Sequence, residues 1–161
     1  MRSLAVSKQV NFQLVYVADV EWGTETFSKL SPFVPFSNIR LVIVTRRDYD
    51  SHDELDSPGS TPHTDSELQD VQAGRSVFLE RLGLEVASFL LWFADTNKIP
   101  KISDDGKSGG FSVMGWSLGA VSPLSVLGNP DMIPKESRPT LASYFRQSIL
   151  YSTFLSYRPF Q

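Results

Sequence analysis

The sequence contains no cysteine in 161 residues, and only two histidines, His52 and His63. A disulfide framework, a cysteine-ligated zinc site and thiol catalysis are therefore excluded. Five acidic residues surround His52, at positions 48, 50, 53, 54 and 56. This pattern predicts a solvated acidic loop rather than a metal site, and we expect neither a metal nor a cofactor.

Long hydrophobic runs and an excess of positive charge are also missing. The apolar stretches fall far short of the roughly 20 residues that a membrane span needs, and residues 1–8 are too polar for a secretory signal. Lysine and arginine number 15 against 18 acidic residues, a net charge of −3. No basic field favours nucleic acid, so we expect a cytoplasmic protein with no membrane or nucleic-acid partner.

The composition that remains is that of an ordinary globular domain. Hydrophobic residues make up 41% of the chain and charged residues 20%, close to average usage. A length of 161 residues corresponds to about one domain. We therefore expect residues 1–161 to form a single domain.

Strands and helices are predicted to alternate along the chain. Apolar, β-branched runs predict strands over residues 12–18, 39–45, 111–115 and 147–152. Helical spacing of apolar residues predicts a helix over 65–97, capped by Asp65 or Ser66 and interrupted near Gly83. Shorter helices are expected within 27–36 and over 117–127 and 140–146, with loops over 46–66 and 101–110.

This alternation predicts an α/β fold with a mostly parallel, doubly wound sheet of about four strands and flanking helices. The simplest strand order is second, first, third, fourth. That order reverses between the first and third strands, where such sheets bind ligands.

The residues Gly115-Trp116-Ser117-Leu118-Gly119 fit the pattern G-x-S-x-G. The predicted strand runs directly into this motif and the predicted helix runs directly out of it. A nucleophile elbow has this strand–turn–helix context, which lifts the serine hydroxyl above the sheet. The alternative is a plain tight turn that happens to expose a serine.

The chain resembles the α/β-hydrolase superfamily, and its fungal serine hydrolases in particular. The stretches that carry the resemblance are IRLVIVTRRDY (39–49), PGSTPHTDSEL (58–68), FLERLGLEVASFLLWF (78–93), IPKISDDGKSGGFSVMGWSLGA (99–120) and PKESRPTLASYFRQSILY (134–151). The resemblance implies a partial α/β-hydrolase fold whose four strands correspond to the third to sixth of the family's eight. It also implies a chain truncated after the sixth family strand, with an exposed sheet edge that favours self-association.

The same resemblance assigns roles to individual residues. Ser117 would be the nucleophile, the Leu118 backbone an oxyanion-hole donor, and the loop of residues 46–61 a wall of the site. The family usually has His-Gly where this chain has Ala18-Asp19, so the second oxyanion donor would be the backbone at Asp19. No histidine follows Ser117, although the family places its histidine there. His52 and His63 are the candidates for a substitute base.

Two functions follow from these observations. The first is a serine hydrolase that acts on a small ester or related acyl substrate. The second is a catalytically inactive or truncated hydrolase-like module that lacks the triad histidine and acid. They differ in whether Ser117 has a base, because a serine hydroxyl without one is a weak nucleophile.

Overall fold

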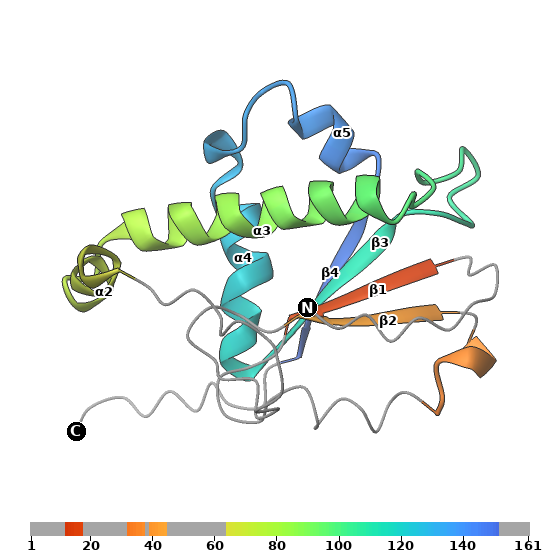
Figure 1. Cartoon of the computed structure of the whole chain (residues 1–161), viewed down its shortest axis with the longest axis horizontal. Helices are drawn as coiled ribbons and strands as arrows, with labels where there is room; N and C mark the ends of the chain where they lie inside the picture. The colour runs from red at the N-terminus through yellow and green to blue at the C-terminus, as the bar shows by residue number, and fades with distance from the viewer. Residues whose placement is uncertain (1–11, 18–31, 38, 45–63, 152–161) are drawn as a thin grey trace, which may run out of the picture.

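Four parallel strands form one sheet in the computed structural model, which describes residues 12–17, 32–37, 39–44 and 64–151 (Figure 1). The strands are β1 (Phe12–Val17), β2 (Ile39–Val44), β3 (Phe111–Trp116) and β4 (Phe145–Tyr151). Their order in the sheet is β2-β1-β3-β4, and each neighbouring pair is parallel. The predicted α/β class and strand order are confirmed.

The sheet buries apolar side chains on both faces. Alternate residues of β3 point to opposite faces, so Phe111 and Val113 are buried on one face while Met114 and Trp116 pack on the other. Strands covered on both faces carry near-continuous hydrophobic sequence. The runs IRLVIV in β2 and FSVMGW in β3 reflect this double burial.

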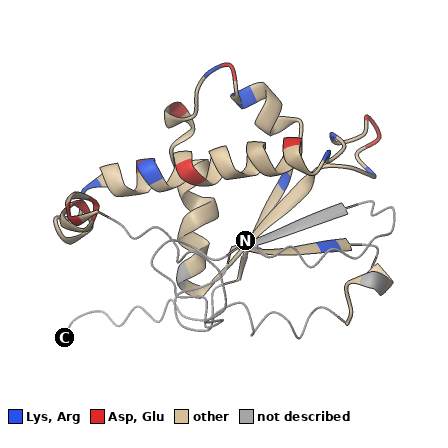
Figure 2. Ribbon diagram, viewed as in Figure 1, with Lys and Arg blue, Asp and Glu red and all other residues tan. Residues whose placement is uncertain are grey.

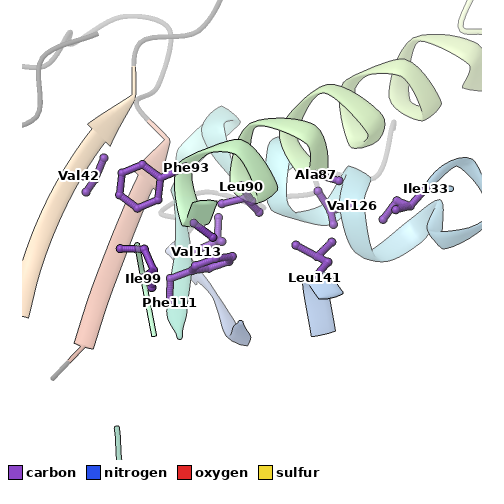
Figure 3. Close-up of a cluster of buried hydrophobic side chains, with 11 residues drawn as sticks. Val42, Ala87, Leu90, Phe93, Ile99, Phe111, Val113, Val126, Ile133 and Leu141 are labelled. Carbon is purple, nitrogen blue, oxygen red and sulfur yellow. The ribbon is translucent and has the colours of Figure 1, made fainter. Parts of the chain in front are cut away.

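Three helices contribute to the core on the first face. They are α3 (Ser76–Thr96), α4 (Val121–Gly128) and α5 (Arg138–Ala142). Leu90 of α3 and Phe111 of β3 are fully buried, and Figure 3 shows the α3 side chains directed toward those of the strands. The cluster comprises Val42, Ala87, Leu90, Phe93, Ala94, Ile99, Phe111, Val113, Val126, Ile133 and Leu141.

A smaller cluster covers the opposite face. Val34, beside the 3-10 turn η1 (Pro35–Ser37), packs against Leu41 of β2, and so does Trp116 of β3. The short helix predicted within residues 27–36 is represented in the described part by this 3-10 turn. Residues 27–31 lie outside the described residues.

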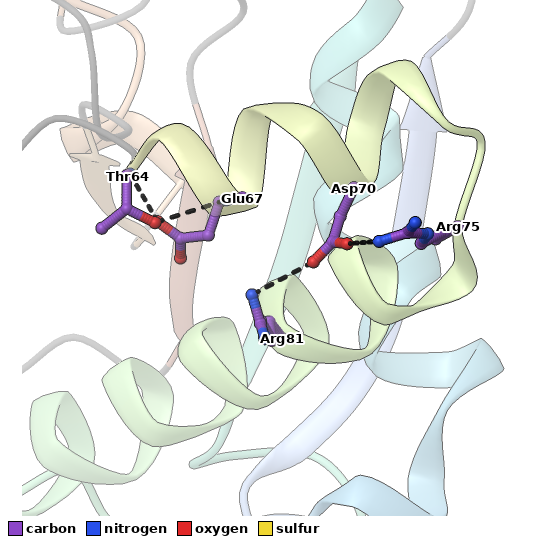
Figure 4. Close-up of polar contacts among 5 residues, drawn as sticks. All are labelled: Thr64, Glu67, Asp70, Arg75 and Arg81. Carbon is purple, nitrogen blue, oxygen red and sulfur yellow. Dashed lines mark hydrogen bonds and ion pairs between the residues drawn. The ribbon is translucent and has the colours of Figure 1, made fainter.

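The long helix predicted over 65–97 is wrong in two details. The structure has two helices, α2 (Asp65–Gln72) and α3, and the break lies at Gly74, whose φ is +63°. The N-cap is Thr64 rather than Asp65 or Ser66. Its hydroxyl accepts the Glu67 N–H, and the Glu67 carboxylate accepts the Thr64 N–H at 2.7 Å (Figure 4). This capping box satisfies two backbone donors at once, an advantage that neither alternative cap shows.

A buried carboxylate fixes the corner between α2 and α3. Asp70 is 7% exposed and accepts from the Arg75 guanidinium at 2.9 Å and from that of Arg81 at 3.3 Å (Figure 4). Two cations compensate the desolvation of this carboxylate, since a buried charge is tolerated when it is paired and hydrogen-bonded.

Gly83 does not interrupt α3, contrary to the prediction, but lies inside it at the contact with α4. A Cβ at Gly83 would lie 2.5 Å from the Ser125 carbonyl oxygen and 2.9 Å from its carbon. Gly83 therefore allows the two helix backbones to approach more closely than any other residue would. The glycine is required by packing and not by a turn.

The helix predicted over 140–146 is also wrong at both ends. Helix α5 ends at Ala142, and β4 already begins at Phe145. The Phe111 N–H donates to the Tyr144 carbonyl at 2.7 Å, and the Phe145 ring meets the Phe111 ring edge-on at 6.1 Å. Strand pairing and aromatic packing therefore fix this segment as a strand.

A bulge at the start of β4 frees Arg146 from the ladder. Phe145 pairs with Phe111 and Gln147 pairs with Ser112, so Arg146 is the extra residue. Its guanidinium donates to three carbonyls of the 101–110 loop, those of Gly109 at 2.6 Å, Ser108 at 2.7 Å and Gly106 at 2.8 Å. One side chain thus holds the loop that leads into β3.

The same loop contains an internally bonded carboxylate. The Ser103 hydroxyl donates to Asp105 at 2.6 Å and the Lys107 N–H donates at 3.0 Å. These two bonds lower the pKa of Asp105. Its contribution to stability is therefore present above the carboxyl's usual pKa and is lost as the pH falls through the lowered value.

β4 has β3 as its one neighbour in the described part of the sheet. Ile149, Leu150 and Tyr151 are all exposed there, and the predicted self-association through this edge stays a prediction. In the described residues, no helix combines the length and apolarity needed to cross a bilayer.

Replacing Gly83 by alanine is expected to lower the free energy of unfolding by about 1–3 kcal/mol. Alanine gains up to about 1 kcal/mol of helix propensity, but its methyl group meets α4 backbone atoms that cannot rotate away. Urea unfolding followed by circular dichroism measures the change. Gly128→Ala is the control, because nothing lies within 4 Å of that Cβ. Equal effects at the two positions would contradict the close approach of α3 and α4.

Replacing Arg146 by lysine is expected to cost about 2–4 kcal/mol, since one ammonium cannot satisfy three divergent carbonyls. Hydrogen exchange should become faster at the amides of residues 103–110. The control is Arg81→Lys, because Arg81 makes a single ion pair that an ammonium can replace. Unchanged exchange in the Arg146 variant would show that the guanidinium does not hold the loop.

Candidate active site

Ser117 lies in a sharp turn between a strand and a helix. β3 ends at Trp116, the 3-10 turn η2 covers Ser117–Ala120, and α4 begins at Val121. Ser117 has φ +53°, and Lys98 is the other non-glycine residue with positive φ in the described part of the chain. This conformation costs an L-residue roughly 1–2 kcal/mol. Such strain persists where the surrounding structure enforces it, commonly at functional sites.

Gly115 makes this turn possible. A Cβ there would lie 2.5 Å from the Ala120 Cα and 2.6 Å from the Gly119 carbonyl oxygen. The turn therefore folds directly back onto the end of β3, and no side chain fits at position 115. Gly119 and Ala120 are buried beneath it, while Ser117 is exposed.

The turn lies at the carboxyl end of β3, where the strand order reverses. β3 has β1 on one side and β4 on the other, and ligands bind at this reversal in open parallel sheets. Trp116 is partly buried and packs with Leu41 and Met114. This agrees with a ring that anchors the strand directly before the turn.

The 3-10 turn η2 and the helix α4 form one helical segment that begins at Ser117. Leu118 is the second residue of η2, and N–H groups in the first turn of a helix lack acceptors within that helix. Such groups can stabilise an oxygen that becomes negative in an acyl-transfer reaction. The structure places Leu118 in the first turn after β3, and its role as an oxyanion donor stays a prediction.

The described residues contain no partner of the kind that activates a serine. Asp131, in the 3-10 turn η3 (Pro130–Met132), is exposed and pairs with Arg138 at 3.2 Å. It follows the end of α4 that is remote from Ser117, and Glu136 is exposed farther along. Asp19, His52 and His63 lie outside the described residues, and in the described ranges no three His, Asp or Glu side chains cluster as for a metal.

Two further residues belong to this region and were not identified from the sequence. Ser122 in the first turn of α4 is fully buried, and its hydroxyl has no hydrogen-bond partner. Tyr151, the last residue of β4, is aligned with Trp116 and is exposed. The predicted strand order was the available signal for Tyr151, because it places the end of the fourth strand beside the end of the third.

No family model matches this chain, and neither the curated proteins nor the solved structures compared with it yielded a match. The arguments for a function therefore rest on the site itself.

Ser117→Gly is expected to unfold at higher denaturant than Ser117→Ala, by about 1 kcal/mol, because glycine adopts positive φ without the Cβ penalty. Ser88 is the matched control, an exposed serine within α3. There alanine should be the more stable replacement by about 1 kcal/mol. The same order at both positions would show that Ser117 does not have positive φ in solution.

Proposed function

We propose that this chain is a serine hydrolase of the α/β-hydrolase type, acting on a small ester or related acyl substrate. The observation that carries the proposal is the backbone at Ser117. An exposed serine with positive φ, at the end of a parallel strand and the start of a helix, has the local geometry of a nucleophile elbow. The described four-stranded sheet would then be part of that fold.

In this reaction the Ser117 Oγ attacks the carbonyl carbon of the substrate, and its proton passes to a base. The carbonyl oxygen becomes negative and accepts the Leu118 N–H, with the backbone at Asp19 as the second donor. The tetrahedral intermediate collapses as the C–O bond of the ester breaks, and the protonated alcohol leaves. Water then attacks the acyl-serine, which releases the acid and regenerates Ser117.

The base is assigned to His52 or His63, since these are the histidines of the sequence. An imidazole is the side chain best suited to accept a proton near neutral pH. Loss of the base in a serine hydrolase lowers turnover by up to about a million-fold. The turnover rate of this chain therefore depends above all on whether one of these histidines acts as the base.

The alternative is a hydrolase-like module without catalysis. The position of the acidic residues that follow Ser117 supports this alternative. Asp131 forms an ion pair with Arg138 and lies beyond the end of α4 that is remote from Ser117. No histidine follows Ser117 in the sequence. In that case the strained turn remains, but Ser117 has no group to take its proton.

Reaction with a fluorophosphonate separates the two functions. A hydrolase is expected to gain one phosphonyl group per chain by intact mass, and Ser117→Ala should gain none. Of the variants His52→Ala and His63→Ala, the one that lacks the base should react at least 100-fold more slowly. The other histidine variant is the matched control and should keep the wild-type rate.

The chain must be shown to be folded in each case, by a cooperative urea transition. A folded chain that does not react at Ser117 contradicts the hydrolase and leaves the inactive module. Equal rates in both histidine variants would assign the base to neither residue.

A further inference from the structure

Tyr151 lies beside the Ser117 turn although it is 34 residues away in the sequence. It is aligned with Trp116 in the parallel β3–β4 pair, and β4 contacts the Ser117–Ala120 turn. Aligned residues of neighbouring strands point to the same face of a sheet. The Tyr151 side chain is 57% exposed, so its ring is open to a ligand at this edge.

In the described part of the chain, the segments that adjoin Ser117 on this side carry no charge. Residues 111–130 are twenty consecutive uncharged residues, and so are residues 147–151. Figure 2 shows β3 and the described part of α4 without a blue or red segment. The charges nearest in sequence to the other strand ends are Asp19 and Glu21 after β1, and Arg46 and Arg47 after β2. Those strands lie on the opposite side of β3 from β4.

From this asymmetry we infer that the acyl group of the substrate lies on the β4 side of Ser117, is uncharged and apolar, and contacts Tyr151. The inference rests on the proposed function and adds the substrate class and a specificity-determining residue. Its decisive feature is the pairing of an exposed aromatic ring with described segments of β3, α4 and β4 that contain no ionic partner.

The physical basis is desolvation. An alkyl or aryl acyl chain gains by leaving water against the Tyr151 ring and the exposed side chain of Ile149, which lies two residues earlier on the same face of β4. A carboxylate on the same chain would lose its hydration with no Lys or Arg from the described strand ends to replace it. Trp116, which is aligned with Tyr151 and partly buried, packs against Leu41 and provides a further apolar side chain on the same face.

Three alkyl fluorophosphonates test the inference: a methyl phosphonate, an octyl phosphonate and an octyl chain that ends in a carboxylate. Second-order rate constants for phosphonylation of Ser117 are measured by intact mass. The octyl probe should react at least tenfold faster than the other two. Tyr151→Ala should reduce the octyl-over-methyl ratio about tenfold, and Tyr151→Phe should retain it, because the ring and not the hydroxyl makes the contact.

Trp92→Ala is the control for loss of an exposed aromatic ring, since Trp92 is 51% exposed on α3. It should leave all three rate constants unchanged. Tyr151→Lys should invert the preference and accelerate the carboxylate-terminated probe, a gain that unfolding cannot produce.

Each outcome has a defined meaning. Reaction at Ser117 with equal rates for the methyl and octyl probes, or with ratios that Tyr151→Ala and Tyr151→Lys leave unchanged, overturns the inference and leaves the hydrolase intact. Loss of the ratio in Tyr151→Phe also overturns it, because a polar contact would then be responsible. If a folded chain reacts with none of the probes, the proposed function and this inference fall together.

Discussion

The close approach of the Ser117–Ala120 turn to the end of β3 is the constraint on which the site depends. With Ala120 Cα 2.5 Å from where a Cβ of residue 115 would stand, the chain reverses with no room for a side chain. The reversal leaves Ser117 at φ +53°, at the first residue of the helical segment that follows β3. Backbone strain of this kind clusters at functional sites, and it is the basis on which we propose a catalytic role for Ser117.

The rest of the described fold holds that turn in place. α4 cannot slide along the sheet, because its backbone at Ser125 meets α3 at Gly83 and Val126 is embedded in the main cluster. At the opposite end of β3, Arg146 holds the preceding loop through three carbonyls, while Phe111 stacks on Tyr144 at 6.2 Å. Both ends of β3 are thus fixed, and strain can be stored in the turn at its carboxyl end.

Much of this could be predicted from the sequence because the strands are short runs of buried residues, and their alternation with helices left few topologies. The errors have physical causes. Gly74 and Gly83 look alike in the helical pattern of the sequence. Gly74 has positive φ, whereas Gly83 packs against the backbone of α4, and neither property can be read from the neighbouring residues.

Thr64 was missed as the N-cap although Thr64 and Glu67 have the capping-box spacing, because Asp65 and Ser66 are also good caps. Phe145 fitted the helical spacing of its neighbours, and only its contact with Phe111 makes it a strand residue.

The base of the site could not be derived, because a triad is assembled from distant segments, and Asp19, His52 and His63 lie outside the described residues.

The most direct test of the central claim is a crystal structure of the chain after phosphonylation at Ser117. The claim is that the turn presents the Ser117 oxygen and the Leu118 N–H to the same reacting centre. The account predicts a positive φ at Ser117 and a phosphonyl oxygen within about 2.7–3.1 Å of the Leu118 nitrogen. A negative φ, or a phosphonyl group whose oxygens all point to solvent, would contradict it.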